Sequence, residues 1–196
     1  MPGILVYRTE QGVISMTTAT SVKRKIGTSR LLTLSGLFTA VIFVTTAYIH
    51  IPTGMGYTHA GDGFIFLAAA MLPKKYAVPA AAVGAALADL ASGMSIWIPA
   101  TVIIKALTVL PFTSKHGKTL VPRNYAALIP ALILCAGGYS IYEALIMTDG
   151  SASAAFAAAF GQVPFYAVQI GIGAAVFTAL GRAADASHLF ASARKQ

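Results

Sequence analysis

The stretch YTHAGDGFIF, residues 57–66, gives the main indication of the fold of this chain. It joins a polar loop directly to a hydrophobic run, so His59 and Asp62 lie where a membrane segment begins. Asp89, Lys105 and Glu143 lie inside other hydrophobic runs. Charged side chains are costly in a bilayer and almost always face the protein interior or a water-filled cavity there. The sequence therefore predicts a buried polar cluster within a membrane protein.

The composition indicates an integral membrane protein. Of the 196 residues, 57% are hydrophobic and only 10% are charged, whereas a soluble domain carries about 25% charged residues. The net charge of +8 does not indicate nucleic-acid binding, because the lysines and arginines lie in short gaps between apolar runs. The single cysteine, Cys135, has no partner for a disulfide and no metal-site spacing around it. We interpret it as a packing residue.

The hydrophobic runs predict an all-α integral membrane protein with six transmembrane helices and both termini cytoplasmic. A basic N-terminal tail (1–30) precedes the six-helix membrane domain (31–183), and a cytoplasmic C-terminal tail (184–196) follows it. We expect the helices at about 31–50, 61–73, 77–92, 99–112, 125–147 and 162–180. The second and third are short for spans, but one long helix would place Lys74 and Lys75 in mid-membrane.

The positive charges support this topology. Of the 14 lysines and arginines, 13 fall in the proposed inner segments, and the proposed outer loops hold none. Lys105 alone lies within a span. Such an asymmetry is how membrane orientation is encoded, because basic residues are retained on the cytoplasmic side.

The topology places the intramembrane charges in the outer half of the bilayer. Lys105, for example, lies about six residues, or roughly 9 Å, from the outer end of its span. Helical spacing extends the polar faces, since Tyr139 lies one turn from Glu143 and Gln169 continues a stripe along the last span. We therefore expect a polar pocket open to the outside. Its candidate residues are Tyr57, His59, Asp62, Asp89, Trp97, Lys105, Tyr139, Glu143 and Gln169.

Structural roles are open for several of these residues. An Asp89–Lys105 ion pair could fix the register of two helices. Asp62 could cap a helix N-terminus. Tyr57 and Trp97 suit membrane-interface aromatics as well as ligand platforms.

The loop at 51–60 holds Pro52, Gly54 and Gly56 and is long for a membrane hairpin, which suits a lid over the site. The chain has no GxSxG, HExxH or Walker A motif, so we expect no enzyme and no cofactor. Uphill transport would therefore need an ion gradient or a partner.

Several segments resemble the substrate-binding (S) component of energy-coupling factor (ECF) vitamin transporters, in particular the riboflavin-type S components. They are GDGFIFL (61–67), AALADLASG (85–93) and WIPATVIIKA (97–106), and GYSIYE (138–143) and the region 164–169 extend the match into the fifth and sixth predicted spans. The combination is specific, although each piece alone is weak. The resemblance extends from the first predicted span through the sixth.

The resemblance implies six helices and a vitamin or vitamin precursor bound near the outer face, under the first loop. It also implies docking on a membrane coupling subunit that carries two cytosolic ATPases, in a bacterial or archaeal plasma membrane, with Gly36 and Ala40 contacting that subunit. Such proteins are thought to topple in the membrane to release substrate. One departure is Tyr166, where a small polar residue is expected, so riboflavin is not assumed as the ligand.

Two other classes of protein remain as alternatives. One is a stand-alone proton- or ion-coupled small-molecule transporter, with Asp89 and Glu143 as the proton carriers. The other is a membrane-embedded enzyme or structural subunit, against which the missing catalytic motifs count.

Overall fold

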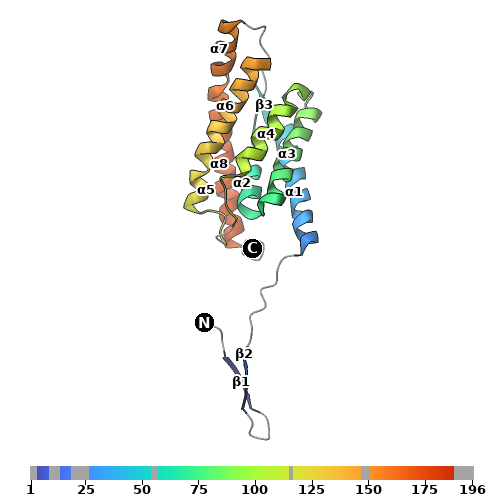
Figure 1. Cartoon of the computed structure of the whole chain (residues 1–196), viewed down its shortest axis with the longest axis vertical. Coiled ribbons are helices and arrows are strands. Elements are labelled where there is room, and N and C mark those ends of the chain that lie inside the picture. The colour runs from blue at the N-terminus through green and yellow to red at the C-terminus, as the bar shows by residue number, and fades with distance from the viewer. Residues whose placement is uncertain are drawn as a thin grey trace.

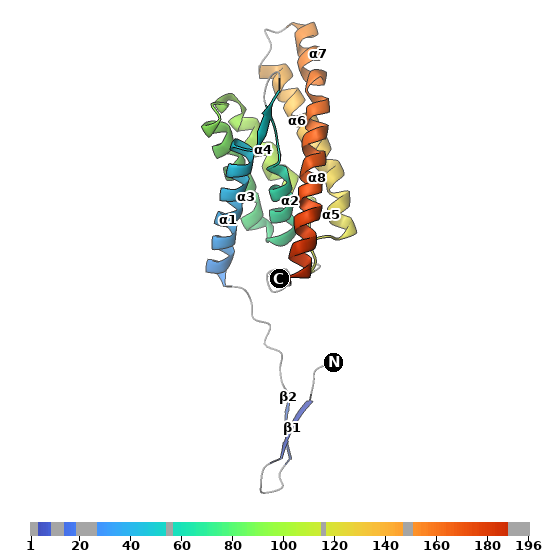
Figure 2. The same cartoon turned by 180° about the vertical axis from the view of Figure 1, so that it is seen from behind.

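The computed structural model describes residues 4–8, 14–18, 27–53, 57–114, 117–146 and 151–187. Between residues 27 and 187 the described chain is mostly helical (Figures 1 and 2). The helices are α1 (Thr28–Ala47), α2 (Asp62–Met71), α3 (Lys74–Ala91), the 3₁₀ helix η1 (Ser95–Trp97), α4 (Ile98–Val109), α5 (Pro122–Ala126), α6 (Leu128–Ile146), α7 (Ala152–Gly161) and α8 (Val163–Ala186). The strands are β1 (Ile4–Arg8), β2 (Ile14–Thr18), β3 (His50–Pro52) and β4 (Tyr57–His59).

Helix α2 is the central element of the bundle. It contacts α1, α3, α4 and α8, while the outer helices pack in the order α1, α3, α4, α6, α8. All of its residues except Phe64 are buried. Its mixture of small and large apolar residues explains this position, because a helix that is apolar all round is stable where protein surrounds it.

The six predicted segments are helical in the structure, with the fifth divided into α5 and α6, but their lengths differ from those predicted, and η1 and α7 are additional. Three are long and apolar enough to cross a bilayer: Thr28–Ala47, the continuous stretch Pro122–Ile146, and Val163–Ala186. Helices α2 and α4 have 10 and 12 residues, or about 15 and 18 Å, against a hydrocarbon core of about 30 Å. Six crossings therefore remain a prediction. The start of α1 and the end of α8 lie at the same end of the bundle (Figure 1).

Two segments contain strands that the sequence did not predict. The expected loop at 51–60 forms an antiparallel hairpin of β3 and β4, in which His50 pairs with His59 and Pro52 with Tyr57. The N-terminal tail contains a second antiparallel hairpin of β1 and β2. Residues 54–56 lie outside the described residues.

At the end of the bundle where α1 begins, a lysine joins two helices. The Lys74 ammonium group, at the start of α3, donates to the carbonyl oxygens of Val109 and Phe112 at 3.3 and 3.1 Å, and also to that of Leu110. These carbonyls lie at the C-terminal end of α4, where a positive charge is favourable. Lys74 therefore stays out of the apolar core, as the two-helix reading of 61–92 requires.

An aromatic cluster fills the bundle away from the β3–β4 hairpin. The rings of Phe66 and Phe112 stack with centroids 5.3 Å apart, and Phe177 meets both edge-on at 6.4 and 6.0 Å. All three side chains are fully buried. These three rings occupy this part of the bundle, and the buried polar residues lie closer to the hairpin end.

Candidate functional site

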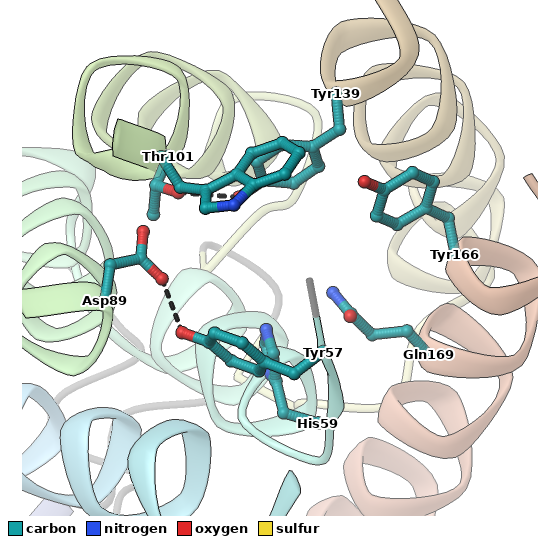
Figure 3. A pocket seen from close by; sticks show the side chains of 8 residues that line it. Tyr57, His59, Asp89, Thr101, Tyr139, Tyr166 and Gln169 are labelled. Atoms are coloured by element: carbon teal, nitrogen blue, oxygen red, sulfur yellow. Dashed lines mark hydrogen bonds between the residues drawn. The ribbon is translucent and has the colours of Figure 1, made fainter. Parts of the chain in front are cut away.

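A pocket opens beneath the β3–β4 hairpin and is lined by α3, η1, α4, α6 and α8 of the bundle and by strand β4 of the hairpin (Figure 3). The space between its lining atoms is about 340 Å³ when counted out to the open mouth, and the volume available to water is about 30 Å³. That volume has room for two or three water molecules only. The lining residues are Tyr57, His59, Asp89, Trp97, Thr101, Tyr139, Tyr166 and Gln169.

The hairpin is tied to the wall of the pocket by one hydrogen bond. The Tyr57 hydroxyl, on β4, donates to Oδ1 of Asp89 near the end of α3 (Figure 3). Asp89 is only 5% exposed, and its second oxygen, Oδ2, has no hydrogen bond of standard geometry. The Tyr57–Asp89 bond therefore holds the hairpin over the pocket and leaves one carboxylate oxygen unpaired.

Aromatic rings form the opposite side of the pocket. The Tyr139 and Tyr166 rings stack with centroids 5.3 Å apart, and the Trp97 ring meets Tyr139 edge-on at 5.8 Å. The Tyr139 hydroxyl lies 3.1 Å from Oγ1 of Thr101. The Trp97 indole nitrogen is buried without a hydrogen-bond partner. Flat ring faces with a free N–H donor suit a planar ligand that can accept a hydrogen bond.

A buried ion pair lies next to the pocket and is joined to it by the Gln169 amide. The Lys105 ammonium group donates to Oδ1 of Asp62 at 2.7 Å, and Nε2 of Gln169 donates to Oδ2 of the same carboxylate at 2.8 Å. Asp62 is 0% and Lys105 1% exposed. These contacts join α2, α4 and α8. No hydrogen bond reaches Oε1 of Gln169 from the residues that the structure describes, so this oxygen is available to a ligand.

Two structural interpretations of these charges were wrong. Lys105 pairs with Asp62, not with Asp89, because the central position of α2 brings Asp62 against α4. Asp62 is not the N-cap of α2 either: Gly61 holds that position, without a side-chain cap. The Asp62 carboxylate instead points inward to its two partners.

Glu143 lies beside the pocket rather than on its lining. Its Oε1 accepts a hydrogen bond from the Tyr166 hydroxyl at 2.5 Å, so it holds the ring that forms one wall. The other oxygen, Oε2, is buried without a partner. Within the described chain, the pocket is thus accompanied by two carboxylates that each keep one unpaired oxygen.

His59 is held in its neutral form. Its Nδ1 accepts a hydrogen bond from the Gly61 backbone N–H at 3.2 Å, which leaves the proton on Nε2. Burial lowers the pKa of His59 from 6.5 to about 4, against a smaller opposing influence of Asp62. At neutral pH this side chain therefore adds no positive charge to the pocket.

The structure brings most of the candidate residues together. Six of the nine line the pocket: Tyr57, His59, Asp89, Trp97, Tyr139 and Gln169. Asp62 and Lys105 lie under them, and Glu143 lies behind Tyr166. Thr101 and Tyr166 also line the pocket and were not among the nine, although helical spacing from Lys105 and Gln169 places them on the same faces.

Comparison with known proteins gives one match. A family model described as "ECF-type riboflavin transporter, S component" matches residues 27–185. The chain belongs to this family. It is thus a membrane protein of vitamin uptake, an S component. No curated protein and no solved structure matches the chain.

Removing the positive charge under the pocket should destabilise the S component strongly. Lys105→Met leaves the Asp62 carboxylate buried without a cation, which costs about 3–5 kcal/mol. We expect a clear drop in the melting temperature of the detergent-purified protein. The double variant Asp62→Asn/Lys105→Met removes both charges while an oxygen still accepts from Gln169, so most of the loss should be recovered. A single variant that melts like the wild type would contradict the pairing.

Lowering the pH should destabilise the fold through His59. The folded-state pKa of about 4 lies below the unfolded value of 6.5, so stability is complete above pH 6.5 and is lost as the pH falls toward 4. The expected loss between pH 7.5 and pH 5 is about 2 kcal/mol. His59→Asn keeps an acceptor but cannot titrate. Melting curves of the two proteins should diverge below pH 6.5, and parallel pH profiles would refute the buried neutral histidine.

Proposed function

We propose that this S component binds a water-soluble vitamin or vitamin precursor with high affinity at the outer face of the membrane. It then delivers the ligand inward as part of an ECF-type ABC importer. The observation that carries this proposal is the polar pocket, which combines aromatic walls with unpaired hydrogen-bonding atoms under a hairpin. Such a concave site with a few placed polar groups is typical of small-molecule binding.

The candidate residues take three roles in this proposal. Tyr57 and His59 form the lid, and Asp89, Trp97, Tyr139 and Gln169 contact the ligand directly. Asp62 and Lys105 act through Gln169, whose amide they orient, and Glu143 acts through Tyr166. Because the volume available to water holds only a few molecules, the lid must move for a vitamin to enter. The Tyr57–Asp89 hydrogen bond is the contact that opening would break.

The proposed partners are a membrane coupling subunit and two cytosolic ATPases, in the plasma membrane of a bacterium or archaeon. The chain itself has no nucleotide-binding motif, so in this proposal the ATP is hydrolysed by the partner subunits. Gly36 and Ala40 are the proposed contacts with the coupling subunit. They lie one turn apart on the exposed face of α1, and small residues let two membrane helices approach closely.

Binding can be followed by the fluorescence of Trp97, because it is the only tryptophan and lines the pocket. Titration of the purified protein with water-soluble vitamins, riboflavin included, should give one saturable change with a Kd below the micromolar range. Tyr139→Leu removes a ring from the wall and should weaken that affinity at least tenfold. Leu145→Ala, at an exposed site on α6, is the matched control. No saturable change in a cooperatively melting sample would refute the proposal.

Assembly with the coupling subunit should depend on α1. Nothing lies within 4 Å of a Cβ added at Gly36, so Gly36→Leu fits the isolated protein. We expect it to abolish co-purification with the coupling subunit while vitamin affinity is unchanged. Gly171→Leu, at an equally open position on α8, is the control. Normal co-purification of the Gly36→Leu protein would exclude this face as the contact.

A further inference from the structure

The charges around the pocket do not balance. The positive charge of Lys105 is neutralised by Asp62 at 2.7 Å. Among the described residues, Lys105 is the one lysine or arginine with a buried side chain. His59 is neutral, since burial lowers its pKa to about 4. Asp89 and Glu143 are therefore left without a cation of their own.

These two carboxylates are not satisfied by hydrogen bonds either. Each receives one tyrosine hydroxyl, Tyr57 on Asp89 and Tyr166 on Glu143, and each keeps one buried oxygen without a hydrogen bond of standard geometry. The Thr101 side chain is a further polar neighbour of Asp89. A buried polar atom that lacks a partner costs free energy, and a buried unpaired charge costs more. Asp62 shows what a purely structural carboxylate looks like in this bundle, because both of its oxygens are engaged.

The walls add to the negative character of the site. The rings of Tyr57, Trp97, Tyr139 and Tyr166 line the same pocket as Asp89. Figure 3 shows the Tyr57, Tyr139 and Tyr166 rings around this space. The face of an aromatic ring carries the negative part of its quadrupole and attracts cations, by about 2 kcal/mol or more where water is excluded. Aromatic faces and an unpaired carboxylate therefore favour the same kind of ligand.

We infer that the vitamin bound by this S component is a planar organic cation, a nitrogen heterocycle with a fixed or protonated positive charge. The inference rests on the proposed function and narrows its ligand. The cationic nitrogen takes the place of the Tyr57 hydroxyl beside Asp89 when the hairpin opens. The ring packs on Tyr139 and Trp97, and the Glu143 carboxyl group lies behind Tyr166.

The test compares ligands of matched shape and different charge. The matched pair is pyridoxamine, which carries a protonated amine, and pyridoxine, which carries a hydroxyl in its place. Thiamine, a fixed cation, and riboflavin, which is neutral, extend the comparison to larger vitamins of different shape. Titrations of the full-length protein, read by Trp97 fluorescence, should give at least a tenfold tighter Kd for a cation than for its neutral counterpart. The preference should weaken as salt is added, although less than for an exposed charge.

Two variants test whether Asp89 and Glu143 cause the preference for cations. Asp89→Asn keeps the shape and the hydrogen bond from Tyr57 but removes the charge, and should reduce the cation preference to threefold or less. Glu143→Gln should reduce it in the same direction and serves if the Asp89 variant does not fold. Asp185→Asn makes the same charge change at the far end of α8, where the carboxylate accepts from the Thr119 and Leu120 N–H groups, and should keep the wild-type ratio.

The outcomes separate this inference from the proposed function. Tight binding of riboflavin or pyridoxine, with no preference for the cations and no effect of Asp89→Asn, overturns the inference and leaves vitamin binding in place. Saturable binding of no compound of either charge overturns both. A cation preference that survives in both the Asp89→Asn and Glu143→Gln proteins also overturns the assignment to these carboxylates.

Discussion

The arrangement of this protein depends on one buried ion pair, between Asp62 at the start of α2 and Lys105 in the middle of α4. Neither charge could stay in an apolar bundle alone, and together they are stable only with good geometry and further hydrogen bonds. Gln169 supplies such a bond and ties α8 to the pair. Three helices are thereby fixed at one level of the bundle, with the polar pocket on the hairpin side of that level and the aromatic cluster on the other side.

The same physical rule separates the structural charges from those left for a ligand. Asp62 has every oxygen engaged, whereas Asp89 and Glu143 each keep one oxygen unpaired beside a closed hairpin. The same bundle thus contains one carboxylate whose oxygens are both hydrogen-bonded and two carboxylates that each have an oxygen without a hydrogen bond. Unsatisfied buried groups of this kind are the usual mark of a functional site, where stability is given up for binding.

Much of this could be predicted from the sequence, because depth along a membrane helix can be counted in residues from the ends of its apolar run. That counting gave the helical segments and the shared level of the charges, and the structure brings six of the nine predicted residues to one pocket. Counting residues along the chain does not predict which side chains on different helices pair with each other. The pairing of Lys105 with Asp62 rather than Asp89 follows from the central position of α2, which depends on contacts with four other helices.

Local sequence patterns predicted the loop at 51–60 and the unusual residue Tyr166, but not the structure that each of them forms. Pro52, Gly54 and Gly56 indicated a loop, but the β3–β4 pairing is a matter of backbone register that depends on packing against the bundle. Tyr166 was recognised as an unusual residue, yet its role as a wall depends on stacking with Tyr139 and on the Glu143 acceptor, which lies on a different helix.

The most direct measurement is native mass spectrometry of the S component purified in mild detergent from cells grown in rich medium. The account predicts one small organic molecule bound per chain, with the mass of a water-soluble vitamin or its precursor, and its loss from the Tyr139→Leu protein. A folded wild-type protein that carries no such molecule, and takes up none from an added vitamin mixture, would contradict the account.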